Sequence, residues 1–100
     1  MARLTLRFAI SARTELNDIL GYIALANPVA AAKLATEIES SLLRLLEFPE
    51  SGRLIPEEPT ARARELVVPP LIRIFFRVEG PVVRILHIIR AEQSFPPKGW

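Results

Sequence analysis

Four side chains in the second half of the chain are of types that could act on a phosphodiester bond if the fold brings them together. His87 can give or accept a proton near neutral pH, and Arg64, Arg73 and Arg77 can hold a phosphate through their planar guanidinium groups. Arg73 and Arg77 are four residues apart in a predicted strand, so they share one face. Glu65 is a candidate partner of His87 in proton transfer. This set would suit RNA cleavage, in which a 2′-hydroxyl attacks and a 5′-oxygen leaves.

The same residues also have a structural interpretation. His87 alternates with apolar residues, where a histidine that is hydrogen-bonded within the sheet is common. Arg64 can pair with a carboxylate such as Glu65, and Arg53 can satisfy carbonyl groups of its loop. Phe75 can stack on a base or pack inside the fold. Proton donors and acceptors are scarce, because the one tyrosine lies in a predicted helix and the lysines lie outside the predicted strands.

Composition restricts the class of protein. The 100 residues suit one domain, and half of them are hydrophobic. There is no cysteine and one histidine, so we expect no disulfide, no multi-histidine metal site and no cofactor. The sequence has no apolar run of 18 residues and no secretory signal at residues 1–10, which predicts a cytoplasmic protein without a membrane span. The net charge is +2, with the basic excess in the second half, which is therefore the expected place for an acidic partner. The alternative is that these are surface arginines that keep the protein soluble.

Hydrophobic periodicity predicts strands at both ends of the chain and two helices between them. Ser11 is the expected N-cap of the first helix, and Asn27 with Pro28 should begin the second. A charged loop then runs to about Thr60. The predicted elements are a strand over 3–10, helices over about 12–25 and 28–47, strands over 62–68, 71–78 and 82–89, and an irregular tail from about 91.

This order, β-α-α-β-β-β, predicts an α+β fold in which a helical hairpin packs on an antiparallel sheet. The strand before the helices must join the three strands after them. The strand over 71–78 places one set of residues on each face, and both sets contain bulky side chains, so we expect the sheet to be partly covered on both sides. One set is Ile72, Ile74, Phe76 and Val78, and the other is Leu71, Arg73, Phe75 and Arg77. His87 is expected on the same face as Val83, Ile85 and Ile89.

Six short segments, in order and at matching distances, resemble the ParE/RelE superfamily of toxins from type II toxin–antitoxin systems, with the ParE branch favoured. They include a first helix like "DL-x-x-I-x-x-YIA", a loop like "L-x-x-FP-x-x-GR" and a strand like "V-x-IL-H-V-x-R". The resemblance covers residues 3 to 91, and its segments are Leu16–Ala24, Asn27–Ala31, Leu45–Arg53, Arg64–Val67, Ile74–Val78 and Val83–Arg90. The chain departs from the family at Ile72 and Phe76, where a tyrosine is common.

The resemblance implies one of two activities. ParE-like members are similar to poisons of DNA gyrase without catalysis of their own, and RelE-like members resemble nucleases that cut messenger RNA on the ribosome. A nuclease would use Arg64, Arg73, Arg77 and His87. The candidates for binding the target are Arg53, Arg64, Arg73, Arg77, Arg90 and Trp100.

The resemblance also implies a ParD-like antitoxin that forms a hetero-oligomer with the chain. An amphipathic antitoxin segment could lie in an apolar groove beside the helical hairpin or add to a sheet edge. The expected contact residues are Leu20, Ile23, Leu42 and Leu45. Two further hypotheses are a non-toxic relative that binds only the antitoxin, and a nucleic-acid-binding protein. The second has little sequence support, because no binding motif is present and the basic excess is slight.

Overall fold

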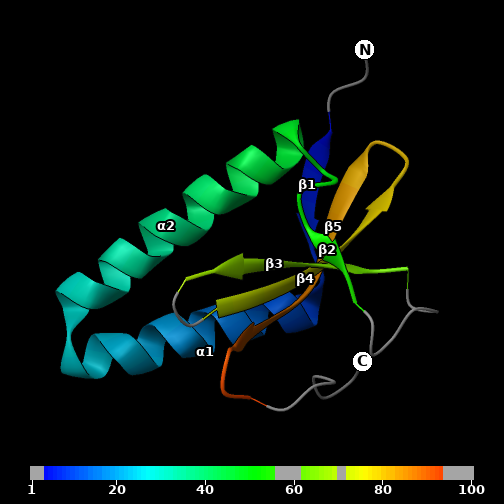
Figure 1. The fold of residues 1–100 in the computed structure, drawn as a ribbon. Coiled ribbons are helices and arrows are strands. Elements are labelled where there is room, and N and C mark those ends of the chain that lie inside the picture. Colours follow the sequence, from blue (N-terminus) through cyan, green and yellow to red (C-terminus); the bar gives the residue numbers. More distant parts are fainter. Residues whose placement is uncertain (1–3, 56–61, 70–71, 94–100) are drawn as a thin grey trace.

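In the computed structural model, residues 4–55, 62–69 and 72–93 are described. They form two helices and five strands in an α+β arrangement, which confirms the predicted fold class (Figure 1). The elements are β1 (Thr5–Phe8), α1 (Ile10–Ala26), α2 (Pro28–Glu47), β2 (Arg53–Leu54), β3 (Arg64–Val68), β4 (Ile72–Glu79) and β5 (Val82–Arg90). The predicted charged loop beyond residue 55 and most of the predicted tail lie outside the described residues.

The turn between the helices forms as the sequence predicts. Asn27 is the N-cap of α2, where its Oδ1 accepts a hydrogen bond from the backbone N–H of Ala30 at 3.0 Å. Pro28 occupies the first turn, where a missing N–H costs nothing. The two helices diverge from this turn as a V, and both lie on the same side of the sheet (Figure 1).

The start of α1 differs from the prediction. The helix begins at Ile10, two residues earlier than expected, and its N-cap is Ala9 rather than Ser11. Ala9 offers no side-chain cap, and the Ser11 hydroxyl donates to the carbonyl of Leu86 instead. Ile10, the last residue of the strand predicted over 3–10, lies instead in the first helical turn and is 87% exposed.

The five strands form one sheet in the order β1-β5-β4-β3-β2. The strand before the helices does join the later strands, as predicted, but it runs parallel to β5, whereas the other pairs are antiparallel. The two-residue strand β2 was not predicted, because so short a segment carries no periodicity. It pairs with the beginning of β3 and leaves the rest of that strand as a sheet edge.

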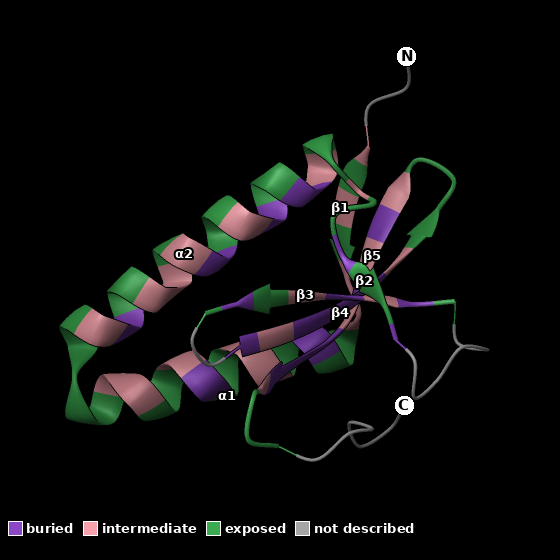
Figure 2. Ribbon diagram, viewed as in Figure 1, coloured by how far each residue is buried: buried purple, intermediate pink, exposed green. Residues whose placement is uncertain are grey.

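The main core lies between the helices and one face of the sheet (Figure 2). Ile72, Ile74 and Phe76 of β4 point into it, as predicted, and each is 1% exposed or less. Val78 follows the same alternation but is 42% exposed. The core is completed by Ile19 of α1 and by α2 residues such as Ile38 and Leu45. We therefore call this side of the sheet the helix face and the other side the open face.

A smaller apolar cluster of Ile55, Ala63, Phe75 and Ile89 lies on the open face, as expected for a sheet with bulk on both sides. The expected placement of His87 with Val83, Ile85 and Ile89 is wrong. A β-bulge shifts the register between β4 and β5, so that Phe76 pairs with Ile85 and Phe75 with His87. One extra residue in β5 inverts the alternation beyond it. Ile88 consequently faces the helices and Ile89 faces away.

Candidate functional site

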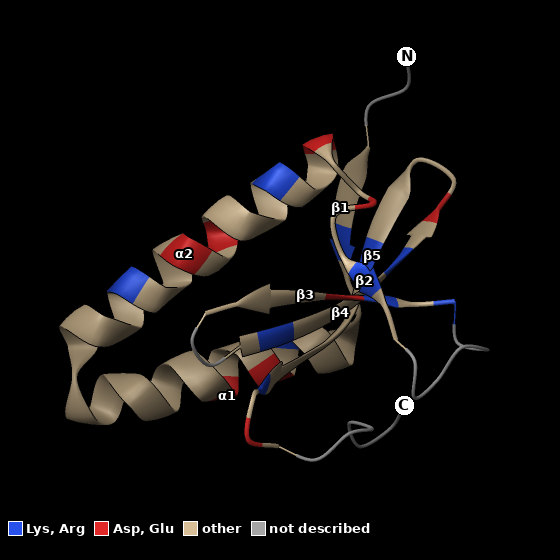
Figure 3. Ribbon diagram, viewed as in Figure 1, with Lys and Arg blue, Asp and Glu red and all other residues tan. Residues whose placement is uncertain are grey.

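The open face of the sheet carries most of the residues that the sequence marked as candidates. Arg53, Glu65 and Phe75 lie side by side on β2, β3 and β4, and Arg73 is on the same face of β4. Since adjacent strands are about 4.8 Å apart, this register brings a carboxylate and two guanidinium groups within contact distance. Figure 3 shows how basic and acidic positions are distributed over the helices and strands.

Glu65 is the centre of a buried ion network on that face. Its side chain is 1% exposed, and Arg53 donates from Nε to Glu65 Oε1 at 2.6 Å. Arg73 donates from Nε to the other oxygen. The Arg73 guanidinium also lies 5.1 Å from the centre of the Phe75 ring. A buried carboxylate needs such charged partners. The two ion pairs in turn hold both arginine side chains against Glu65.

His87 is bound to the helical layer and not to Glu65, which corrects the predicted His87–Glu65 pair. Its Nδ1 lies 2.9 Å from Glu15 Oε2, and His87 is only 5% exposed. The same carboxylate accepts a hydrogen bond from the backbone N–H of Ile88 at 2.9 Å.

This contact completes the edge of β5. Strand β1 covers β5 only as far as Ile85, whose carbonyl accepts from Ala9. Beyond that point the hydroxyl of Ser11 bonds to Leu86, and Glu15 bonds to Ile88. Backbone groups at a covered edge must find partners, and the first turns of α1 supply them. The sequence held no signal for these roles, because Ser11 and Glu15 fit any exposed helix position.

The four residues proposed for RNA cleavage are each held by a different group. Arg64 donates to the carbonyl of Gly52 at 2.8 Å, and Arg77 reaches Glu79 Oε2 at 3.4 Å. The other two, Arg73 and His87, are held by Glu65 and Glu15. Phe75 is 0% exposed and offers no surface to a base. These contacts stabilise the sheet. They do not arrange the four side chains for proton transfer to a substrate.

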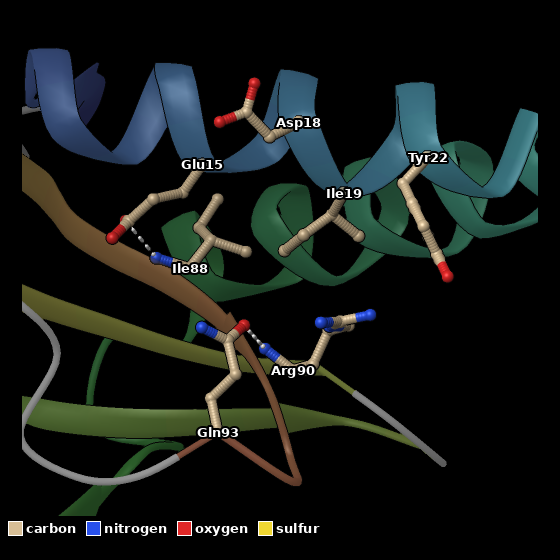
Figure 4. Close-up of a pocket in the computed structure, with 7 residues that line it drawn as sticks. All are labelled: Glu15, Asp18, Ile19, Tyr22, Ile88, Arg90 and Gln93. Atoms are coloured by element: carbon tan, nitrogen blue, oxygen red, sulfur yellow. Dashed lines mark hydrogen bonds between the residues drawn. The ribbon is translucent and has the colours of Figure 1, made fainter.

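Of the remaining candidates for target binding, Arg90 does not lie with those on the open face. Arg90 borders a pocket of about 320 Å³ between α1 and the end of β5, where its guanidinium lies 5.6 Å from the centre of the Tyr22 ring (Figure 4). Gln93 also lines this pocket, and its Oε1 accepts a hydrogen bond from the backbone N–H of Arg90 at 2.8 Å. Trp100 lies outside the described residues.

A second cluster of charge occupies the other end of the open face. Arg7, Arg84 and Arg77 are in register across β1, β5 and β4. Glu79 accepts from Arg84 Nε at 2.8 Å and lies beside Arg77. The hydrogen bond from Arg84 lowers the pKa of the Glu79 carboxyl most, and the hydrogen bond from Arg77 lowers it further, whereas desolvation opposes them. Glu79 is therefore ionised at neutral pH. Sequence analysis missed Arg7 and Arg84, because their alignment depends on the register.

An apolar groove of about 340 Å³ lies where α1 and α2 diverge above β1. Of the four residues expected to contact an antitoxin, Leu20 and Leu42 line this groove. Leu45 is 1% exposed and belongs to the core, and Ile23 is half-buried against the core. The lining residues are Leu6, Phe8, Leu16, Leu20, Ala35, Ile38, Glu39, Leu42 and Leu43.

Within the described ranges, no group of three histidine, aspartate or glutamate side chains could hold a metal ion. No helix in those ranges is long and apolar enough to cross a membrane.

Comparison with known proteins identifies relatives over most of the chain. Residues 6–95 match the family model described as the ParE toxin of the type II toxin–antitoxin system parDE. Toxin RelE2 of Caulobacter vibrioides is 39% identical over 82 residues, which cover 79% of this chain and 89% of that protein. The Y4kP protein of Sinorhizobium fredii is 33% identical over 97 residues, covering 96% of this chain and 97% of its own.

Solved structures share the fold. A chain of the chromosomal ParDE system from P. aeruginosa superimposes with a TM-score of 0.76 at 24% identity, over 92% of this chain and all of that one. Protein HP0894 from Helicobacter pylori superimposes with a TM-score of 0.50 at 13% identity, over 90% and 97% of the two chains. At these identities the likeness concerns the arrangement of helices and strands.

Proposed function

The chain belongs to the ParE toxin family of type II toxin–antitoxin systems, and from this premise we propose that it arrests growth by inhibiting DNA gyrase in the cytoplasm and is neutralised by a ParD-like antitoxin. The match to the ParE family over residues 6–95 carries the proposal. The geometry of the two residues supports it, because Arg73 and His87 are engaged by carboxylates of the protein itself. A poison that acts by binding needs no proton-transfer pair.

Induced expression of the chain alone, in bacteria that carry a DNA-damage reporter, tests the target. We expect growth arrest with the reporter switched on, because trapped gyrase leaves broken DNA. Cells with the same plasmid and a stop codon at Leu16 are the control. Arrest with a silent reporter would contradict gyrase inhibition and favour ribosome-dependent cleavage of messenger RNA, an alternative suggested by the name of the relative RelE2.

We further propose that the antitoxin lies in the groove between α1, α2 and β1. The groove is lined almost entirely by apolar side chains, Glu39 being the exception. A groove of this kind accepts the apolar face of an amphipathic helix. Leu43 is the most accessible of its leucines, since it is 57% exposed at the rim.

Leu43→Glu is therefore expected to weaken antitoxin binding by about 30-fold, the effect of a central contact worth about 2 kcal/mol. The thermal unfolding midpoint should stay unchanged, because the side chain is at the surface. Leu25→Glu is the matched control, since Leu25 is 88% exposed near the helical turn and outside the groove. Binding is measured by titration with the antitoxin encoded beside the chain. Equal affinities for the two variants would place the antitoxin elsewhere, for example along the edge of β3.

A further inference from the structure

The open face holds a row of arginines that the fold itself does not require. Arg7 of β1, Arg84 of β5 and Arg77 of β4 are direct cross-strand neighbours. Their sequence neighbours Leu6, Val83 and Phe76 face the helices, so the three arginines point to the opposite side. Adjacent strands are about 4.8 Å apart, so the row extends over roughly 10 Å.

Such a row has a cost in stability. Like charges directly opposite one another on a sheet repel. Glu79 is the carboxylate that accepts hydrogen bonds from this row, from Arg84 at 2.8 Å and from Arg77 at 3.4 Å. Arg7 is exposed and enters none of the ion pairs found among the described residues. A sheet selected only for stability would alternate the signs of these residues.

The surroundings of the row define the ligand that fits it. In the described part of the chain, the open face carries five arginines (Arg7, Arg53, Arg73, Arg77 and Arg84) against the two glutamates Glu65 and Glu79. It is therefore more positive than the whole chain, whose net charge is +2. The aromatic residue of this face, Phe75, is fully buried and cannot stack on bases. Among the described residues, this face therefore offers a line of cations but no aromatic ring on which a base could stack.

We propose that the row of Arg7, Arg84 and Arg77 binds the phosphodiester backbone of a nucleic acid. Phosphates follow one another along a strand at about 3.4 Å of helix axis and lie farther apart along the winding backbone, so a row of this length faces roughly two of them. Arginine suits this ligand, because its guanidinium fork matches phosphate oxygens. The contact is independent of sequence and depends on salt through the release of counterions. It goes beyond gyrase inhibition and needs neither gyrase nor antitoxin.

Fluorescence anisotropy with the purified chain and a labelled 20-base-pair DNA duplex tests the proposal. At 50 mM salt, Arg7→Gln and Arg84→Gln are each expected to weaken binding by about fivefold and to reduce the slope of log K against log salt by about 0.9. Glu79→Gln should strengthen binding by about threefold, because it removes the carboxylate that Arg84 and Arg77 share. Arg44→Gln and Glu47→Gln, at exposed positions of α2, make the same charge changes on the other layer and should have no effect.

A single-stranded RNA of 20 nucleotides separates the two sources of phosphodiester. Tighter binding of either probe, with the same loss in Arg7→Gln and Arg84→Gln, supports the proposal and identifies the nucleic acid. The proposal is overturned if these variants behave like Arg44→Gln. It is also overturned if a 20-residue polyglutamate peptide binds as tightly as DNA with the same losses, because the row would then serve an acidic protein. Thermal unfolding of each variant verifies that the fold is retained.

Discussion

Replacing Glu65 by alanine is expected to lower the free energy of unfolding by about 3 kcal/mol, at the lower end of the range for breaking a buried ion pair. The Glu65 side chain is 1% exposed and binds both Arg53 and Arg73. Its removal takes from the Arg73 guanidinium, which is 15% exposed, a carboxylate that compensates its charge. The loss is moderated by Arg53, which is 51% exposed and can turn to water. Urea unfolding followed by circular dichroism measures the effect.

Two controls separate charge compensation from packing. Glu47→Ala removes an exposed carboxylate at the end of α2 and should change stability by less than about 0.5 kcal/mol. In the double variant Glu65→Leu with Arg73→Met, both charges are replaced by apolar groups, and most of the lost stability should return. If the double variant is as unstable as Glu65→Leu alone, the loss comes from packing and not from the missing ion pair.

The Gly52→Ala variant is expected to lose about 2–3 kcal/mol of stability, as for overpacking of a core. A β-carbon at Gly52 would lie 2.6 Å from Cε1 and 2.7 Å from Cζ of the Phe76 ring, and 3.0 Å from the backbone oxygen of Glu65. Phe76 is 0% exposed, so its ring has little room to move. The backbone would have to shift at the point where Arg64 bonds to the carbonyl of Gly52.

Gly21→Ala gives the opposite sign and serves as the matched control. No atom lies within 4 Å of a β-carbon built at Gly21 in α1. Alanine there should add about 0.5–1 kcal/mol, because glycine is unfavourable within a helix. Phe76→Leu should reduce the penalty at Gly52 if contact with the ring is its cause. Equal penalties in both backgrounds would assign the loss to the backbone conformation instead.

The sequence predicted those parts of the fold that depend on local chemistry. Asn27 and Pro28 specify a helix start wherever they occur before an amphipathic stretch, and the alternation of Ile72, Ile74 and Phe76 specifies a core face. The parallel pairing of β1 with β5 was not predictable in the same way. It depends on the path of the chain after the helices, for which residues 4–8 carry no signal.

The candidate site was less predictable than the fold, because its contacts join distant parts of the chain. The sequence identified His87, Arg64, Arg73 and Arg77 as notable but not their partners. His87 contacts Glu15 of α1, and a β-bulge breaks the alternation of β5 between Ile85 and His87. Glu65 was paired in prediction with Arg64 or His87, and it binds Arg53 and Arg73 because of the register of β2, β3 and β4. A single extra residue in one strand changes which residues of two strands pair. Hydrophobic periodicity does not reveal the position of that residue.

The pairing of β1 with β5 also determines when the fold can form during synthesis. Ser11 and Leu86, which bond across this part of the structure, are 75 residues apart in sequence. A ribosome adds roughly 5–20 residues per second, so β1 waits for several seconds before its partner strand leaves the exit tunnel. Contacts of such long range also slow folding. Because Leu6 and Phe8 of β1 form one wall of the groove, that groove stays incomplete in a nascent chain until β5 has been translated.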